Sequence, residues 1–293
     1  MLCMTKKISV LGLGAMGSRM ASRLLAGGYD VTVFNRSAGA AAPLIELGAA
    51  PAPTPRDAVE GCDIAISCVR DDEASRQVWL EPQGALDALP VSAVAVESST
   101  LTHAWARELG SAMTNAGKTF LDAPVVGSRP QADAGQLIYL AGGKAEALDR
   151  VRKVLLVMGG AVYHTGPVGT GTAMKLAVNA LFAVQVAALG EVLGLLRRVG
   201  LGESNAVDTL SSMPIASPAM KGVGALMAKR TFEPMFPVEL VEKDLGYVVD
   251  TAAQLSAMTP IASAARATYR KAIEAGLGND NIHGVMKLFD EVR

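Results

Sequence analysis

The sequence predicts an α/β fold in which a doubly wound parallel sheet is followed by a long interdomain helix and an all-α C-terminal domain. Short apolar runs alternate with helical patterns as far as His164. After Gly171 nothing ends a helix before Gly200, apart from two tolerable glycines, and no strand pattern follows. We therefore expect one domain at residues 1–165 and a second, which begins with the long helix, at 166–293.

Composition sets the broad class of the protein. The chain has 293 residues, room for two domains, and half of them are hydrophobic while only 4% are aromatic. A net charge of −1 gives no electrostatic footprint for nucleic acid, so we expect no nucleic-acid partner. The cysteines and histidines show no metal-ligand spacing, which predicts no metal site and reduced thiols in a cytoplasmic protein: Cys3, Cys62, Cys68, His103, His164 and His283. Because only MLCMT precedes the first charged residues, we expect no signal peptide.

A glycine-rich turn follows the first predicted strand. The apolar run Lys7–Leu11 leads into the motif and then a helical pattern, and a second strand is predicted at Asp30–Phe34. This strand–turn–helix context is typical of a Rossmann-type dinucleotide site. We therefore predict that the motif binds the cofactor; the alternative is a βα turn without a ligand. Its residues are Gly12, Leu13, Gly14, Ala15, Met16 and Gly17.

Each glycine of the motif has a separate physical role. Gly12 permits the tight turn, Gly14 lets the backbone approach the pyrophosphate, and Gly17 lets the helix pack closely on the strand. The pyrophosphate then meets free N–H groups at the helix N-terminus.

The end of the second strand indicates which cofactor binds. Asn35, Arg36 and Ser37 stand where NAD enzymes usually place an acid that binds the ribose 2′-hydroxyl. A carboxylate would repel a 2′-phosphate, whereas the guanidinium of Arg36 can bind one. We therefore predict that NADP is preferred over NAD. The alternative is that Arg36 is a solvated surface residue.

Two further strands are predicted at Asp63–Val69 and Ala93–Glu97. Ligands of open parallel sheets bind beyond the carboxyl ends of the strands. The residues expected to border the cofactor are therefore Cys68, Val69, Arg70, Ser99 and Thr100. Thr100 has an alternative role as N-cap of a helix from His103.

The remaining strands enclose a long turn of small and polar residues. Strands are predicted at Thr119–Val125, Gln136–Ala141 and Val162–His164, with a helix at 144–158 before the last one. The turn, residues 126–135, opens at a strand end and should face the same crevice. Backbone N–H groups that its glycines expose could hold a substrate carboxylate.

The long helix carries a lysine and an asparagine on one face near its start. Lys175 and Asn179 lie four residues apart, beyond glycines and threonines that should form a flexible, cappable beginning. A lysine in this place either snorkels to water or serves chemistry. The helix is apolar on nearly all faces, so we expect burial on most sides. Fifteen uncharged residues separate Lys175 from Glu191, fewer than the ~20 that a membrane span needs, so we expect no membrane partner.

The C-terminal domain should be helical throughout. The predicted helices are Ser204–Ser212, Ser217–Lys229, Pro237–Leu255, Pro260–Gly276 and His283–Val292.

Four motifs together resemble one family over essentially the whole chain. They are GLGAMG at Gly12–Gly17, DAPVVGSRPQADAGQL at Asp122–Leu137, GPVGTGTAMKLAVN at Gly166–Asn179, and the triplet Lys243-Asp244-Leu245. The sequence resembles the β-hydroxyacid dehydrogenases, which include 3-hydroxyisobutyrate dehydrogenase, tartronate semialdehyde reductase and the glyoxylate/succinic semialdehyde reductases. The resemblance implies the fold predicted above, a dimer or tetramer, and hydride transfer between NADP(H) and a small β-hydroxy acid or semialdehyde that carries a carboxylate.

The resemblance also implies roles for individual residues. Lys175 would be the catalytic general acid/base, with Asn179 beside it, and Lys243 would lie near the nicotinamide and the substrate. The substrate carboxylate would be held by Val126, Gly127 and Ser128. The family usually has serine where this chain has Val126, so Ser128 or the Gly127 backbone would take over. His283, near a position where the family tends to have a small residue, could narrow or polarise the pocket.

Two other functions fit the same fold. Imine reductases are related to this family, but they generally lack a lysine at the position of Lys175, which favours carbonyl chemistry here. A non-catalytic NADP-binding module would not need Lys175 or Asn179, so their presence favours an enzyme.

Overall fold

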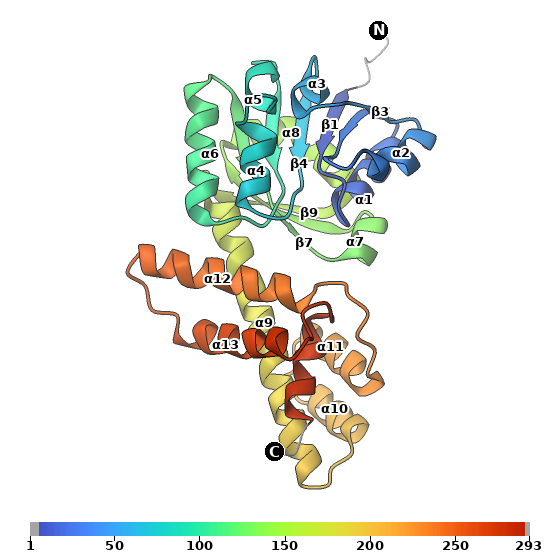
Figure 1. Cartoon of the computed structure of the whole chain (residues 1–293), viewed down its shortest axis with the longest axis vertical. Helices are drawn as coiled ribbons and strands as arrows, with labels where there is room; N and C mark the ends of the chain where they lie inside the picture. Colours follow the sequence, from blue (N-terminus) through green and yellow to red (C-terminus); the bar gives the residue numbers. More distant parts are fainter. Residues whose placement is uncertain (1–5, 291–293) are drawn as a thin grey trace. The chain divides into compact units, whose positions relative to one another are not determined.

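The computed structural model describes residues 6–290 and divides the chain into two compact units, Met1–Lys175 and Leu176–Arg293 (Figure 1). Unit 1 is an α/β domain and unit 2 is helical, so the predicted fold class is confirmed. The domain boundary predicted between residues 165 and 166 remains a prediction. Cys3 and the end of the last predicted helix, at Val292, lie outside the described residues.

Unit 1 is built on a sheet with the strand order β3-β2-β1-β4-β5-β6-β8-β7, and β9 pairs with β8. The first six strands of that order are mutually parallel, as predicted. They are β1 (Lys7–Leu11), β2 (Asp30–Phe34), β3 (Ala50–Pro51), β4 (Ile64–Ser67), β5 (Val94–Glu97) and β6 (Thr119–Asp122). Every residue of β4 and β5 is buried, because helices cover both faces of a parallel sheet.

The far edge of the sheet departs from the parallel pattern. The strand predicted at 119–125 divides into β6 and β7 (Val125–Val126), with Ala123 and Pro124 between them. Strand β8 (Leu137–Gly143) then runs antiparallel to both, and β9 (Gly159–Gly166) is parallel to β8. The chain returns to β8 without a long crossover helix, which only an antiparallel pairing permits.

Helices pack on the two faces of the sheet in separate layers. One layer contains α1 (Gly17–Ala26) and α8 (Ala145–Met158), whose buried side chains include Met20, Leu24, Leu148 and Val151. The opposite core is formed by side chains that include Trp79, Trp105 and Leu109. The helices of that layer are α3 (Pro55–Val59), α4 (Asp72–Trp79), α5 (Ala85–Ala88) and α6 (His103–Asn115).

Two local predictions in unit 1 are corrected. The turn at 126–135 contains a short helix, α7 (Arg129–Asp133), whose proline stands in the first turn, where the missing N–H does no harm. The N-cap of α6 is Thr102 rather than Thr100: its hydroxyl accepts the N–H of Trp105 at 3.1 Å. Asp72 in turn fixes Thr102 by accepting both its N–H and its hydroxyl.

The long predicted helix is α9 (Thr170–Arg198), but the expectation that it is buried on most sides is wrong. Ala183, Val186 and Leu193 are buried in the core of unit 2, whereas Leu181 and Leu195 are 66% and 62% exposed. By length and composition α9 could also cross a membrane, since its most apolar window has a mean hydropathy of 1.8; core helices of soluble proteins meet the same criterion. The absence of a membrane partner therefore stays a prediction.

Unit 2 packs four helices and a 3-10 segment around the C-terminal part of α9. The helices are α10 (Glu203–Ser212), α11 (Pro218–Lys229), α12 (Val238–Gln254) and α13 (Pro260–Glu274), which confirms four of the predicted helices. The last predicted helix is instead the 3-10 segment η2 (Ile282–Phe289).

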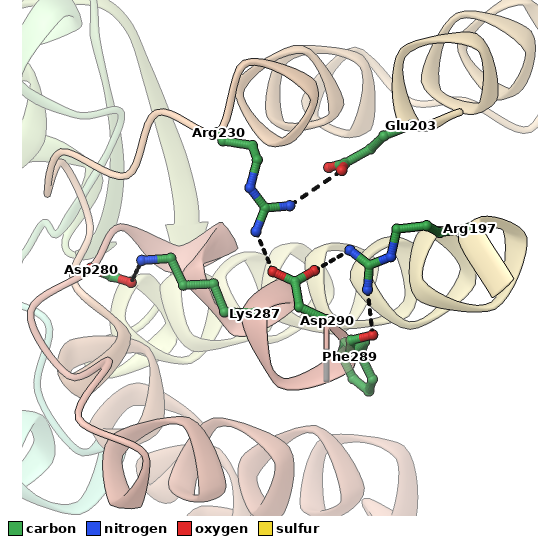
Figure 2. A network of polar contacts seen from close by, with 7 residues as sticks. All are labelled: Arg197, Glu203, Arg230, Asp280, Lys287, Phe289 and Asp290. Atoms are coloured by element: carbon green, nitrogen blue, oxygen red, sulfur yellow. Dashed lines mark hydrogen bonds and ion pairs between the residues drawn. The ribbon is translucent and has the colours of Figure 1, made fainter. Parts of the chain in front are cut away.

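A polar network fixes η2 to two helices of unit 2, as Figure 2 shows. Asp290 accepts hydrogen bonds from Arg197 on α9 and from Arg230, the C-cap of α11. Arg197 also donates to the carbonyl oxygen of Phe289 at 2.7 Å, and Arg230 lies 3.3 Å from a carboxylate oxygen of Glu203. Burial raises the pKa of Asp290, but the two arginines outweigh burial and hold that pKa below its usual value.

His283 is a structural residue of unit 2, buried with none of its surface exposed. Its Nε2–H donates to the carbonyl oxygen of Thr231 at 2.7 Å, and Nδ1 therefore accepts from the Asn281 amide at 3.1 Å. The orientation of Asn281 is fixed, because its Oδ1 already accepts the N–H of Phe236 at 2.9 Å. A proton on Nδ1 would face another N–H, so the ring is held neutral, and burial lowers the pKa of His283.

We expect the stability of unit 2 to fall when the solution becomes acidic. The pKa of His283 lies below its unfolded value of ~6.5, so the neutral ring stabilises the fold above that pH. This stability is lost as the pH falls through the folded-state pKa. His283→Gln should lower the free energy of unfolding at pH 7.5 by about 1–2 kcal/mol and flatten its pH dependence below 6.5. Urea unfolding at a series of pH values would measure both, and equal slopes for the two proteins would contradict this role.

Candidate active site

The glycine-rich turn between β1 and α1 is shaped by close backbone packing. Gly12 has a φ of +95°, and a Cβ there would lie 2.5 Å from the carbonyl oxygen of Cys68. A Cβ at Gly17 would lie 2.0 Å from the carbonyl oxygen of Gly12. Gly14 faces open space, with no atom within 4 Å of a Cβ added to it. The turn thus leaves its middle glycine accessible to a ligand at the start of α1, where backbone N–H groups favour an anion.

Asn35 joins this turn to the end of β2. Its Oδ1 accepts the N–H of Leu13 at 2.9 Å, and its Nδ2 donates to the carbonyl oxygen of Ser37 at 3.0 Å. The side chain is therefore committed to holding the two loops together. The neighbouring side chains of Arg36 and Ser37 are exposed.

The ends of β4 and β5 are connected through a buried carboxylate that the sequence analysis did not identify. The N–H of Val69 donates to Ser99 Oγ at 2.7 Å, and the N–H of Ser99 donates to Glu97 Oε1 at 3.0 Å. Glu97 Oε2 also accepts from Ser75 Oγ at 2.7 Å and from Trp79 Nε1 at 2.9 Å. Burial raises the pKa of Glu97, and these donors oppose the shift. The signal in the sequence was an acid at the end of an otherwise apolar strand.

The charge of Lys175 influences Cys68 at this edge of the sheet. Burial raises the pKa of the Cys68 thiol to about 12, the charge of Glu97 adds to this, and the charge of Lys175 opposes it. Cys68 therefore stays protonated. Lys175 itself is only 8% exposed, so it does not extend along the surface.

The beginning of α9 is bound to the end of β6. The carboxylate of Asp122 accepts the N–H of Gly169 through Oδ1 and the N–H of Thr172 through Oδ2, both at 2.8 Å. The predicted flexible beginning is thus a fixed one, with Gly171 packed against β6 and β8. Lys175 follows three residues after Thr172, within the next turn of the helix.

The loop expected to hold the substrate carboxylate is constrained at each position. Val126 is half-buried in β7, and Gly127 adopts a φ of +124°, which favours glycine. Ser128 is the N-cap of α7 in a capping box, and its N–H donates to Gln131 Oε1 at 2.9 Å. Ser128 already has this structural role, which leaves the backbone at Gly127 as the better candidate of the two predicted substitutes.

Unit 2 brings together the other predicted site residues. Asn179, 8% exposed, donates from Nδ2 to Asp244 Oδ2 at 2.6 Å. Lys243 Nζ lies 3.0 Å from Asp244 Oδ1 and 4.4 Å from the ring centre of Tyr247. Asp244 thus orients both predicted residues. Lys243 belongs to unit 2, whereas the other predicted cofactor residues all belong to unit 1.

The fold and these residues define a nicotinamide-dependent dehydrogenase, and family models cover both units. Residues 7–166 match the NAD binding domain of 6-phosphogluconate dehydrogenase. Residues 169–289 match the model described as NAD-binding of NADP-dependent 3-hydroxyisobutyrate dehydrogenase. The chain belongs to the 3-hydroxyisobutyrate dehydrogenase type of β-hydroxyacid dehydrogenases, as the sequence motifs predicted. It is an NAD(P)-dependent oxidoreductase that acts on a CH–OH group.

Similar proteins occur in a plant and in two bacteria that are only distantly related to each other. Glyoxylate/succinic semialdehyde reductase 2, chloroplastic, of Arabidopsis thaliana is 33% identical over 97% of this chain and 79% of its own length. NAD-dependent L-serine dehydrogenase of Pseudomonas aeruginosa is 32% identical over 97% of this chain and 98% of its own. The structure of Mycobacterium tuberculosis 3-hydroxyisobutyrate dehydrogenase with L-serine superposes with a TM-score of 0.91, at 29% identity over 98% of this chain and 100% of that one.

Replacing Glu97 should weaken cofactor binding more than turnover. Glu97→Gln puts an NH₂ group where a carboxylate oxygen accepts N–H or O–H donors, so the link from Glu97 through Ser99 to Val69 is disturbed. We expect the Kd for NADPH to rise about 10-fold, the equivalent of one lost buried hydrogen bond, while kcat at saturating cofactor changes little. Fluorescence titration and steady-state kinetics would measure the two. An unchanged Kd would contradict this role for Glu97.

Proposed function

We propose that the protein transfers a hydride between NADP(H) and a small β-hydroxy acid or semialdehyde with a carboxylate, of the 3-hydroxyisobutyrate or succinic semialdehyde type. The observation that carries this proposal is the position of Lys175. Lys175 is only 8% exposed as a whole residue, it stands one turn into a helix whose start is bound by Asp122, and its charge opposes the rise in the pKa of Cys68 at the edge of the sheet where the cofactor is expected. A largely buried lysine in such a place is suited to proton transfer.

The residues present fit a bound nicotinamide cofactor, since the glycine turn leaves Gly14 open to a pyrophosphate. When bound, the cofactor supplies or accepts the hydride. In the reducing direction Lys175, as an ammonium, donates a hydrogen bond to the carbonyl oxygen and gives it a proton as negative charge develops there. Asn179 follows on the same face of α9. Since its Nδ2 is bound to Asp244, its Oδ1 is left to accept from the lysine or the substrate hydroxyl.

The substrate carboxylate is assigned to the loop after β7. The peptide N–H at Gly127 is its proposed donor, because Val126 has no hydroxyl and Ser128 caps α7. Lys243 is proposed to lie near the nicotinamide by resemblance to the family. Its charge suits an acidic substrate, although Asp244 already pairs with it.

Replacing Lys175 tests the central role. Lys175→Met keeps an unbranched apolar side chain, one atom shorter than that of lysine, but removes the proton donor. We expect kcat for reduction of succinic semialdehyde, glyoxylate or methylmalonate semialdehyde to fall about 10²–10⁴-fold. NADPH consumption, followed by absorbance, would show this loss, and titration should show cofactor binding within about threefold of the wild type. Wild-type turnover in the variant would exclude Lys175 as the acid.

The preference for NADP is proposed from the residues at the end of β2. Asn35 presents no carboxylate to a 2′-phosphate and is occupied in holding Leu13 and Ser37, while Arg36 is exposed beside it. Arg36→Ala should raise the KM for NADPH about 10–100-fold, because a charge-assisted hydrogen bond is lost. The KM for NADH should stay within about twofold. Arg56→Ala, an exposed arginine on α3, is the matched control and should change neither value.

An equal effect of Arg36→Ala on both cofactors would contradict the assignment of Arg36 to the phosphate. Kinetics with both cofactors over the same substrate panel would also show which substrate the enzyme prefers.

Two further properties are proposed from the structure and the family. The apolar side chains exposed along α9, such as Leu181, Val192 and Leu195, suit pairing with a second copy, so we expect a homodimer or homotetramer. The free thiols of Cys62 and Cys68 suit a cytoplasmic enzyme.

Imine reduction is the alternative activity. Lys175 favours a carbonyl substrate because an ammonium stabilises an oxyanion. A non-catalytic NADP-binding module would show no NADPH consumption across the whole aldehyde panel despite bound cofactor.

A further inference from the structure

We propose that Asp122 is a positioning residue for the reaction: it fixes the first turn of α9 to the sheet and thereby holds the Lys175 amine in place. The proposal rests on the role of Lys175 given above. Asp122 is the last residue of β6 and is completely buried. It belongs to the DAPV motif, whose following residues were predicted to bind the substrate.

The bonds of Asp122 are the kind that set the direction of a helix. The first four N–H groups of an α-helix have no partner within it, so the first turn frays unless an acceptor is supplied. Asp122 supplies two oxygens to the start of α9, one to Gly169 just before the helix and one to Thr172 in its first turn, from a strand 47 and 50 residues earlier in the chain. A negative charge there also interacts favourably with the helix dipole.

Close packing leaves this carboxylate little freedom. A Cβ on Gly142 would lie 2.4 Å from Asp122 Oδ1, and a Cβ on Gly171 would lie 2.4 Å from the Asp122 carbonyl oxygen and 2.3 Å from that of Leu140. Glycine at both positions lets the helix start lie directly on β6 and β8. The carboxylate, the two strands and the first turn thus form one rigid joint.

The position of the lysine amine depends on this joint. Lys175 leaves the helix one turn after the bonded N–H of Thr172, so a tilt or rotation of the first turn moves its amine directly. A displacement of about 1 Å at a reacting group can cost ~10²-fold in rate. A carboxylate is required, because an amide would present an NH₂ group to one of the two backbone N–H donors.

The experiment compares Asp122→Asn, Lys175→Met and the double variant. We expect Asp122→Asn to lower kcat about 10–100-fold, with NADPH Kd within about threefold of the wild type. If Asp122 acts through Lys175, the double variant should lose no more than Lys175→Met alone, because groups that act as a unit are not additive. Steady-state kinetics at saturating NADPH and fluorescence titration of the cofactor provide both readouts.

Ser9→Ala is the matched control for lost stability. Ser9 is buried in β1 and donates to the carbonyl oxygen of Ala58, so the variant loses a buried hydrogen bond of unit 1 away from α9. It should lower the thermal midpoint but keep kcat within about twofold. If Asp122→Asn does not fold, Gly142→Ala, which pushes a methyl group against the same carboxylate, takes its place in the double variant.

Two results separate this inference from the proposed function. If Lys175→Met loses activity but the loss in the double variant is the product of the two single losses, Lys175 remains the acid and the positioning role of Asp122 is overturned. If Lys175→Met turns over like the wild type, the proposed function itself fails, whatever Asp122→Asn does.

Discussion

The joint between the end of β6 and the start of α9 is the constraint on which the rest of the site depends. A buried carboxylate loses its hydration, and that cost is large unless strong donors replace the water. At Asp122 the donors are two backbone N–H groups of the helix start. Burial raises the pKa of Asp122, and these bonds oppose the shift by stabilising the ionised form. The carboxylate at the end of β6 therefore receives its hydrogen-bond donors from the helix start, and the helix start receives its acceptors from the sheet.

A second buried carboxylate, Glu97 on the adjacent strand, is also stabilised by several hydrogen-bond donors. Glu97 and Asp122 are register partners at the carboxyl ends of β5 and β6. Glu97 takes its donors from a hydroxyl, an indole and the backbone of Ser99, whereas Asp122 takes them from the helix. Two neighbouring carboxylates thus arrange two different parts of the site: Glu97 the loops after β4 and β5, and Asp122 the segment that carries Lys175.

The sequence predicted the parts of the fold whose signal is local. Strands β1 and β2 begin and end at the predicted residues, because each is an apolar run next to a glycine or an acid, and the glycine turn was found from its spacing. The antiparallel edge and the short helix α7 were missed, since nothing in an apolar run states the direction of its partner. The exposed face of α9 was not predicted, because an apolar helix face has the same sequence pattern whether or not other side chains cover it.

The site shows a sharper limit of this kind. Lys175, Asn179 and the glycine turn could be picked out from the sequence because their proposed roles depend on their side chains, or on the lack of one. The partners of Asp122 are backbone N–H groups 47 and 50 residues away, and any residue but proline supplies such a group, so no residue type marks them. Asp244 was seen as part of a motif, but its bond to Asn179, 65 residues away, required the folded chain.

In the loop after β7 the proposed contact to the substrate also involves a main-chain N–H group. The side chain of Val126 cannot donate a hydrogen bond, and the Ser128 N–H is bound to Gln131, so the main chain at Gly127 is the proposed donor to a carboxylate there. A main-chain donor recognises a carboxylate whatever the rest of the molecule is. Under this proposal, selection among small acids comes from side chains near the substrate, and an apolar Val126 would favour an apolar or small substituent over a hydroxylated one. A serine at position 126 would add a hydrogen-bond donor that favours a polar substrate. Its absence therefore changes the expected substrate preference, but not the hydride transfer or the proton transfer proposed for Lys175.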